Sequence, residues 1–206
     1  MPDTTNKNQS VYIIDDDESI RGTLQYLLEF EGFQTKAFAT ATDFLTVCDD
    51  EIRGCILLDL KMPEISGLEL QHWLIENRID IPIIFLSGSG DIPLSSQAFR
   101  AGALDFLEKP FDIETLLERI REALQRDSKQ WHIHHRQKLL QERLSHLSPR
   151  EKEAFKWVSA GYSSKEIAKI MAISNRTVEI YRASIMVKMK AESLADLVSI
   201  AIELDI

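Results

Sequence analysis

The chain has 206 residues and a formal net charge of −9, a length that suffices for one large or two small domains with their own cores. It contains no run of about 18 apolar residues, which excludes a membrane-spanning helix. Residues 1–10 are expected to form a disordered leader without the apolar centre of a signal peptide, so we expect a cytoplasmic protein. Cys48 and Cys55 lack metal-ligand spacing and are expected to be free thiols.

The charge is distributed unevenly along the chain. Residues 1–126 carry 11 Lys and Arg against 23 Asp and Glu, whereas residues 127–206 carry 13 against 10. This asymmetry predicts two domains with different partners, the second more tolerant of a polyanion.

Short apolar runs alternate with helical patterns in the first 125 residues. The predicted strands cover residues 11–14, 34–38, 55–58, 83–86 and 104–107. The predicted helices lie between them: one closed by Gly32, one through Phe44 and Val47, one holding Leu68 to Trp73, and one ending at Gly102. The alternation predicts an α/β fold with a parallel sheet covered on both faces, and a doubly wound sheet of this size has the flavodoxin-like order 2-1-3-4-5.

Acidic residues follow two of these strands. Asp15 and Asp16 come after the first strand, and Asp59 comes after the third. In the order 2-1-3-4-5 these strand ends flank the switch point, where ligands bind. Because three converging carboxylates repel one another, we expect a hard divalent cation there, Mg²⁺ or Mn²⁺.

Ser87 and Lys109 follow the fourth and fifth strands and are expected to face the same crevice. A hydroxyl and an ammonium group could hold phosphoryl oxygens. Taken singly, each residue is better explained by a structural role: Asp16 as a helix cap, Ser87 in a turn, and Lys109 as a surface lysine before a proline. Their joint placement at four strand ends favours the functional interpretation.

Residues 11–125 resemble the receiver domain of two-component response regulators, through the motifs IIDDD, LLDLKMP, LSGSGD and DFLEKPF. The resemblance implies that Asp59 accepts phosphate from a kinase histidine, and that Asp15, Asp16, Asp59 and the backbone carbonyl of Lys61 hold the metal. It further implies that Ser87 and Lys109 contact the phosphoryl group and that the Phe106 ring follows Ser87 as a switch. Dimerisation on phosphorylation is expected through the fourth helix, the fifth strand and the fifth helix.

Residues 126–146 are predicted to be a linker, either a continued helix or a solvated connector, because Phe111 to Leu147 contains no Gly or Pro. His132 and His135 could share a helix face. No cysteine or acidic cluster joins them, so we interpret them as part of a solvated linker and not as a metal site.

Residues 147–206 carry repeated helix-start signals. Ser148 and Glu151, and Ser163 and Glu166, are spaced as capping boxes. A third helix is predicted from near Asn175 and a fourth from Ser193. A short helix, a tight turn and a longer helix form the helix-turn-helix arrangement.

The predicted third helix has one apolar stripe and one polar face. The stripe, Val178, Tyr181, Ile185 and Met189, is expected to point inward. The residues predicted to contact DNA bases or phosphates, there and on the preceding helix, are Lys165, Lys169, Arg176, Thr177, Glu179, Ile180, Arg182, Ala183, Lys188 and Lys190. The competing interpretation is a small helical bundle with a solvated charged face.

The segment LSPREKEAFKWVSAGYSSKEIAKIMAISNRTVEIYRASIMVKMKAESLADLV resembles the four-helix DNA-binding domain of LuxR-type regulators. With the receiver, the chain is similar to regulators of the NarL/FixJ group, nearest to FixJ, and RTVEIYRASIMVKM is similar to regulators of tetrathionate respiration. The resemblance implies a phosphorylation-dependent transcriptional regulator whose partners are a sensor histidine kinase, promoter DNA, RNA polymerase and a second copy of itself. It implies no enzyme beyond self-catalysed phosphoryl transfer and slow autodephosphorylation.

Two other functions compete with this one. A Mg²⁺-dependent phosphohydrolase also uses a strand-end aspartate, but it needs a second acid two residues on, where this chain has Lys61. The other is an interaction module whose helical domain binds protein or RNA.

Overall fold

The computed structural model describes residues 9–88 and 102–206, so the helix predicted before Gly102 lies largely outside the described residues. The chain forms two compact units, the first ending at Trp131 and the second running from His132 to Ile206. None of the helices described is long and apolar enough to cross a membrane.

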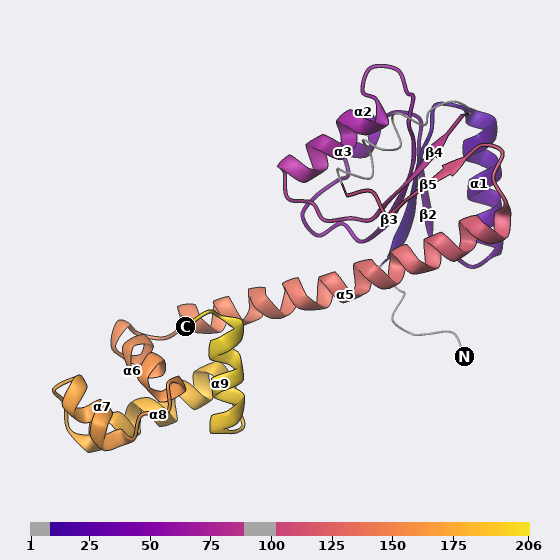
Figure 1. The fold of residues 1–206 in the computed structure, drawn as a ribbon. Helices are drawn as coiled ribbons and strands as arrows, with labels where there is room; N and C mark the ends of the chain where they lie inside the picture. Colours follow the sequence, from indigo (N-terminus) through magenta and orange to yellow (C-terminus); the bar gives the residue numbers. More distant parts are fainter. Residues whose placement is uncertain (1–8, 89–101) are drawn as a thin grey trace. The chain divides into compact units, whose positions relative to one another are not determined.

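The first unit is built on a parallel sheet of five strands: β1 (Ser10–Ile14), β2 (Thr35–Phe38), β3 (Gly54–Asp59), β4 (Ile83–Ser87) and β5 (Asp105–Glu108). Their order is β2-β1-β3-β4-β5, which confirms the predicted topology (Figure 1). α1 (Glu18–Phe30) and the first part of α5 (Ile113–Ser145) cover one face, and α2 (Ala41–Leu45) and α3 (Gly67–Glu76) cover the other (Figure 1).

Every residue of β1, β3 and β4 is buried, as expected for central strands covered on both faces. Alternate side chains enter two cores. Leu57 and Ile84 pack with Leu24 of α1 and Leu116 of α5. On the opposite face, Leu58 and Phe85 pack with Phe44, Leu70 and Leu74 of α2 and α3. The two cores fix the carboxyl ends of the strands, where the predicted site lies.

The disordered leader predicted for residues 1–10 extends too far, because Gln9 and Ser10 are ordered parts of the first unit. Ser10 begins β1, and Gln9 is buried, with its Nε2 donating to the carbonyl of Leu124 at 2.7 Å and to Asp127 Oδ2 at 2.6 Å. Two polar residues carry no apolar signal, so their burial was not predictable from hydrophobic pattern.

Gln9 belongs to a polar cluster that fastens α5 to the amino-terminal edge of the sheet. Arg53, just before β3, donates to Asp127 Oδ2 at 2.9 Å, and its guanidinium carbon lies 4.5 Å from the centroid of the Trp131 ring. We call Gln9, Arg53, Asp127 and Trp131 the α5 clamp. Gly54 allows the start of β3 to lie close to Ser10 of β1, because a Cβ at this position would lie 1.8 Å from the carbonyl oxygen of Ser10.

The second unit contains α6 (Pro149–Ser159), α7 (Ser164–Ile170), α8 (Asn175–Met189) and α9 (Leu194–Glu203). Both predicted capping boxes are present, with Ser148 and Glu151 at the start of α6 and Ser163 and Glu166 at the start of α7. The predicted inward stripe of α8 packs into the core: Val178, Ile185 and Met189 are buried, and Tyr181 is half-buried.

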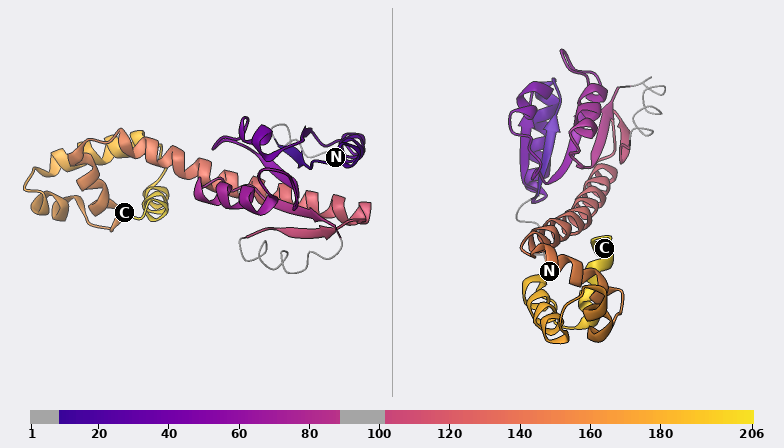
Figure 2. Two further views of the ribbon diagram at one scale, coloured as in Figure 1. Left: turned by 90° about the horizontal axis from the view of Figure 1, so that it is seen from above. Right: turned by 90° about the vertical axis from the view of Figure 1, so that its left-hand side faces the viewer.

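α5 is one unbroken helix of 33 residues that contributes to both units (Figure 2). Leu140 and Leu144 pack in the core of the second unit. Arg136 forms a bidentate pair with Glu203 of α9, and Arg143 Nη1 donates to the carbonyl of Met189 at the end of α8. The last turns of the predicted linker are therefore structural parts of the helical unit.

Candidate functional site: an acidic pocket at the strand ends and a helix-turn-helix surface

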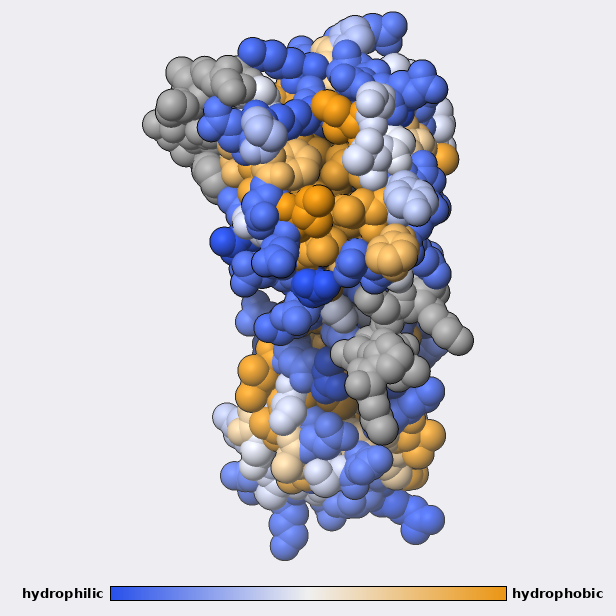
Figure 3. Space-filling model, turned by 90° about the vertical axis from the view of Figure 1, so that its right-hand side faces the viewer, coloured by the Kyte–Doolittle hydropathy of each residue, from blue (hydrophilic) through white to orange (hydrophobic). Residues whose placement is uncertain are grey.

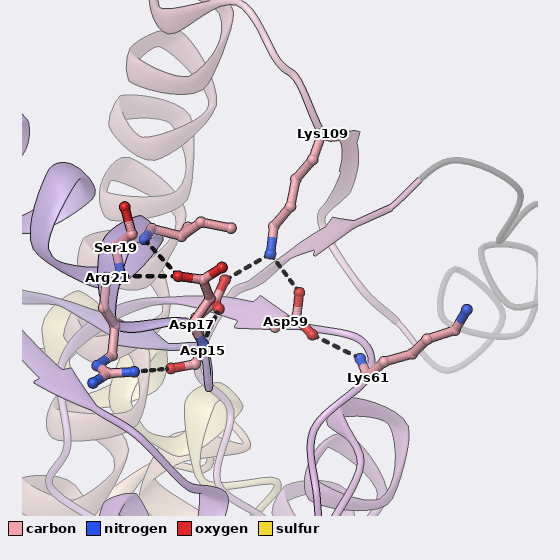
Figure 4. A network of polar contacts seen from close by, with 8 residues as sticks. Asp15, Asp17, Ser19, Arg21, Asp59, Lys61 and Lys109 are labelled. Atoms are coloured by element: carbon pink, nitrogen blue, oxygen red, sulfur yellow. Dashed lines mark hydrogen bonds and ion pairs between the residues drawn. The ribbon is translucent and has the colours of Figure 1, made fainter.

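Asp15, Asp59, Ser87 and Lys109 lie at the carboxyl ends of β1, β3, β4 and β5, as the sheet order requires. Lys109 Nζ donates to Asp59 Oδ1 at 2.6 Å and to Asp15 Oδ2 at 2.7 Å (Figure 4). Asp15 is 1% exposed and Asp59 is 7% exposed. One ammonium thus bridges two almost buried carboxylates on neighbouring strands.

Burial and neighbouring charges change the proton affinity of this pair. Burial raises the pKa of Asp59, and the Asp15 charge adds to the rise; the hydrogen bond and charge of Lys109 and the N–H of Lys61 offset only part of it. The pKa of Lys109 is also raised, because its bonds to both carboxylates outweigh the effect of its own burial. Lys109 therefore stays charged and holds the pocket together.

The Ser87 hydroxyl is 1% exposed, and its Oγ has no hydrogen-bond partner among the described residues. A buried hydroxyl without a partner costs free energy, so it marks a place where an acceptor is missing. Phe106 of β5 is half-buried, with its ring centroid 6.4 Å from that of Phe85. Phe106 packs against the core on the α3 face of the sheet. Because side chains alternate along β4, Ser87 is on the same face as Phe85.

The structure brings two of the three predicted metal-site carboxylates together. Asp16 is exposed, and within the described residues no three carboxylate, imidazole or thiol groups are arranged to hold an ion. Lys61 lies beside the acceptor, since its N–H donates to Asp59 Oδ2 at 2.9 Å. Mg²⁺ is usually held by one or two carboxylates and several waters, so the buried pair fits this ion as a donor set.

Sequence reasoning missed two residues of this pocket. Arg21, in α1, donates from Nη1 to the backbone carbonyl of Asp15 at 2.7 Å. Asp17 caps α1, and its N–H donates to Asp15 Oδ1 at 2.9 Å. In the sequence, Arg21 is recognisable only as an arginine four residues after the helix cap Asp17. Many solvated helix faces show this spacing, so it does not by itself indicate a pocket residue.

An apolar groove lies beside the pocket, between α1 and the segment from Lys109 into α5. It measures about 500 Å³, and its wall includes Ile20, Leu27, Lys109, Phe111 and Ile113. Figure 3 shows apolar side chains gathered on the side of the first unit that carries α1. Lys109 therefore borders both the acidic pocket and an apolar surface.

The predicted DNA-contacting residues lie on α7 and α8, except for Lys190, which caps the carboxyl end of α8. Those that are exposed are Lys165, Lys169, Arg176, Glu179, Ile180, Ala183 and Lys190, whereas Thr177, Arg182 and Lys188 are half-buried. Ile180 is 59% exposed, so its apolar side chain is accessible on this face of α8. The turn between the two helices places Ala172 at a φ of 54°, and Ser174 caps α8.

Lys188 has a structural partner. Its Nζ donates to both carboxylate oxygens of Glu151, at 2.7 and 2.8 Å, and Ser184 Oγ donates to the same carboxylate. Burial raises the pKa of Glu151, but the bonds from Lys188, Ser184 and Ser148 outweigh it and lower the pKa to about 2. Glu151 therefore ties α8 to the start of α6, a role beyond the capping box that the sequence indicated.

The comparisons with known proteins cover both units. Residues 11–121 match the model of the response regulator receiver domain, and residues 145–201 match that of the bacterial regulatory proteins of the luxR family. The chain is 42% identical over 190 residues to the response regulator protein TodT of Pseudomonas putida F1, covering 92% of this chain and 84% of TodT.

Two further similarities extend over nearly the whole chain. The transcriptional regulatory protein FixJ of Azorhizobium caulinodans is 40% identical over 192 residues, covering 93% of this chain and 91% of FixJ. The solved structure of the response regulator StyR superposes with a TM-score of 0.89 at 37% identity, covering 95% of this chain and 99% of StyR. The chain therefore belongs to the response regulators of the NarL/FixJ group, the transcriptional regulators of two-component systems that join a receiver to a luxR-type DNA-binding domain.

Proposed function

We propose that Asp59 accepts a phosphoryl group from the phosphohistidine of a sensor kinase and that the modified chain regulates transcription by binding promoter DNA. The observation that carries the proposal is the position of Asp59, a nearly buried carboxylate that accepts a hydrogen bond from Lys109. The neighbouring strand β4 ends at Ser87, whose hydroxyl has no hydrogen-bond partner among the described residues. Because a kinase and DNA must both reach the protein, we expect it in the cytoplasm.

In the transfer step, a carboxylate oxygen of Asp59 attacks phosphorus. A P–O bond forms, the P–N bond of the phosphohistidine breaks, and its electron pair returns to the imidazole. Forming this acyl phosphate, a mixed anhydride, removes the carboxylate charge that Lys109 contacts. The ammonium group and the Ser87 hydroxyl then donate to phosphoryl oxygens, which supplies the acceptor that Ser87 lacks.

Asp15 and Asp59, with Asp16 and the backbone carbonyl of Lys61, would hold Mg²⁺ or Mn²⁺. When bound, such an ion supplies charge neutralisation to the phosphoryl oxygens. Asp16 is exposed at the pocket edge, so it must turn inward to join the other two acids.

The signal leaves the pocket through Ser87 and Phe106. As Ser87 engages the phosphoryl group, the Phe106 ring follows, and the face that includes β5 and α5 becomes competent to dimerise. Two copies of α8 would then enter adjacent major grooves about one helical turn apart. Ile180 suits a thymine methyl group, Arg182 a guanine or a phosphate, and Lys165 and Lys169 phosphates.

Replacing the acceptor tests the chemistry. Asp59→Asn should abolish covalent labelling by a phosphorylated kinase or by acetyl phosphate, because an amide is a poor nucleophile, while circular dichroism stays unchanged. Asp50→Asn, at an exposed position, is the matched control and should label normally. Label retained on Asp59→Asn would refute the assignment, and steady phosphate release from small phosphomonoesters would favour a phosphohydrolase.

Binding to genomic DNA fragments, with and without a phosphoryl donor and Mg²⁺, tests the second unit. Lys165→Ala should weaken binding about equally for all sequences and lower its salt dependence, whereas Ile180→Ala should change the preferred sequence. Binding that ignores duplex sequence, or a preference for RNA, would count against the proposal.

A further inference from the structure

The carbonyl of Asp15 lies where the sheet ladder stops. The register of β1 with β2 and β3 ends at the pairs Ile14–Phe38 and Ile14–Leu58. Beyond them the N–H of Asp15 still reaches the carbonyl of Phe38, at 3.3 Å. The described contact of the Asp15 carbonyl is the guanidinium of Arg21, at 2.7 Å. The Arg21 side chain thus donates to the Asp15 carbonyl, whereas within the sheet a carbonyl of β1 accepts from the backbone N–H of a neighbouring strand.

Asp15 is also fastened through its side chain. Oδ1 accepts from the N–H of Asp17, and Oδ2 accepts from Lys109. Asp17 in turn caps α1 by accepting from the N–H groups of Ser19 and Ile20. Figure 4 shows these contacts as one network that runs from α1 through Asp15 to Asp59. The peptide between Asp15 and Asp16 is therefore held between the end of β1 and the first turn of α1.

The chemistry of arginine suits this position. Its guanidinium is always charged, planar and rich in donors, so one half-buried side chain can orient a carbonyl and place a positive charge beside a group of acids. Asp16 is the acid that must turn inward to complete a cation site. The direction of its side chain depends on the orientation of the peptide that Arg21 holds.

We propose that Arg21 is a positioning residue of the acidic pocket, which fixes the Asp15–Asp16 peptide so that both carboxylates can bind the divalent cation. The inference rests on the proposed function, since it assumes that this pocket binds the cation. Arg21 acts through Asp15 and Asp16 and touches neither the cation nor the phosphoryl group. A purely structural Arg21, in contrast, would affect only the stability of α1.

Mn²⁺ binding to the full-length protein, followed by electron paramagnetic resonance, provides a test independent of phosphorylation. Arg21→Gln removes the charge and shortens the side chain, and it should weaken Mn²⁺ binding by about 10- to 100-fold, the usual effect of losing a group that orients metal ligands. Arg21→Lys keeps the charge and a donor, so its affinity for Mn²⁺ should fall less than that of Arg21→Gln. Arg121→Gln, at an exposed position in α5, is the matched control. Its dissociation constant for Mn²⁺ should stay within about twofold of the wild-type value, a change well below the loss expected for Arg21→Gln.

The outcomes separate the two proposals. If the wild type binds no Mn²⁺, the cation site itself is wrong. If the wild type binds and Arg21→Gln binds equally well, even with a lower melting temperature, only the role of Arg21 is overturned.

Amide hydrogen exchange of the wild type gives a second measurement that needs no variant. Saturating Mg²⁺ should slow exchange of residues 15–21, because the cation orders the peptide that Arg21 and Asp17 hold. Unchanged exchange there, in protein that demonstrably binds Mg²⁺, would contradict the inference.

Discussion

Glu151 is a buried carboxylate surrounded by donors from two helices. It accepts from the backbone N–H of Ser148, from the Ser184 hydroxyl and from the ammonium group of Lys188. Charge-assisted hydrogen bonds of this kind are stronger than neutral ones, and removing one partner leaves others buried and unsatisfied. The orientation of α8 against α6 thus depends on one side chain whose sequence signal indicated only a helix start.

Glu151 should make the second unit sensitive to acid. Its pKa is about 2 in the folded chain against an ordinary value of 4.5. A lowered folded pKa gives stability that is complete above pH 4.5 and is lost as the pH falls toward 2. Glu151→Gln should cost about 1.5–3 kcal/mol at pH 7, the value of hydrogen bonds to a charged group, and should remove much of this pH dependence.

Urea unfolding at pH 3, 5 and 7, followed by far-ultraviolet circular dichroism, measures both effects. Glu153→Gln is the control, since Glu153 is exposed and pairs with Arg150 on the helix surface; it should change stability by less than about 0.5 kcal/mol. Equal stabilities of the two variants at pH 7 would contradict the role given to Glu151.

α5 is the element whose contacts were hardest to foresee. Its first turns show apolar spacing, but the α5 clamp joins residues from three distant parts of the chain. Asp127 accepts from Gln9 and from Arg53, which are more than 70 positions away in sequence. A polar residue in a helix normally predicts a solvated face, and only the folded sheet brings these partners together.

Breaking the clamp should loosen α5 locally. Arg53→Ala leaves the Asp127 carboxylate buried with one donor fewer and removes the cation from the Trp131 ring. Amide exchange of residues 124–131 should become faster, while that of α9 should not change. Lys129→Ala, an exposed position on the same stretch of helix, should leave exchange nearly as in the wild type. Similar exchange in both variants would show that the clamp does not hold α5.

The strands followed from the sequence because central strands of a parallel sheet are continuous apolar runs, and residues 55–58 and 83–86 are such runs. The acidic pocket followed from the same reasoning, since parallel strand ends share an edge. Arg21, Gln9 and the buried role of Glu151 did not follow. Each is a polar residue with an ordinary solvated interpretation, and its partners are fixed by tertiary structure. Val47, placed in the second helix, is exposed and lies beyond the end of α2 at Leu45.

At the scale of the whole molecule, the boundary between the units lies inside a helix. Residues up to Trp131 pack with the sheet, and Leu140 and Leu144 pack with α6, α8 and α9. The family models match residues 11–121 and 145–201, and so omit these helix turns.

A fragment of residues 132–206 should therefore be more stable than one of residues 147–206, by about 3 kcal/mol or more for the two lost leucines. Thermal or urea unfolding of both fragments measures the difference. In the longer fragment, Leu140→Ala should cost about 2–4 kcal/mol, because Leu140 is 3% exposed. Leu139→Ala is the matched control at 38% exposure and should cost less than 1 kcal/mol. Equal stabilities of the two fragments would contradict the assignment of these turns to the helical unit.

The shared helix also limits how nature or an engineer could recombine such regulators. A chimera joined at residue 121, the end of the receiver match, would take Gln9 and Arg53 of the α5 clamp from one parent and Asp127 and Trp131 from the other. Residues 132–139 are all exposed in the chain and belong to none of the three cores. A crossover within those two turns would leave each parent's buried contacts intact, so this short exposed stretch is where input and output modules of related proteins can be exchanged.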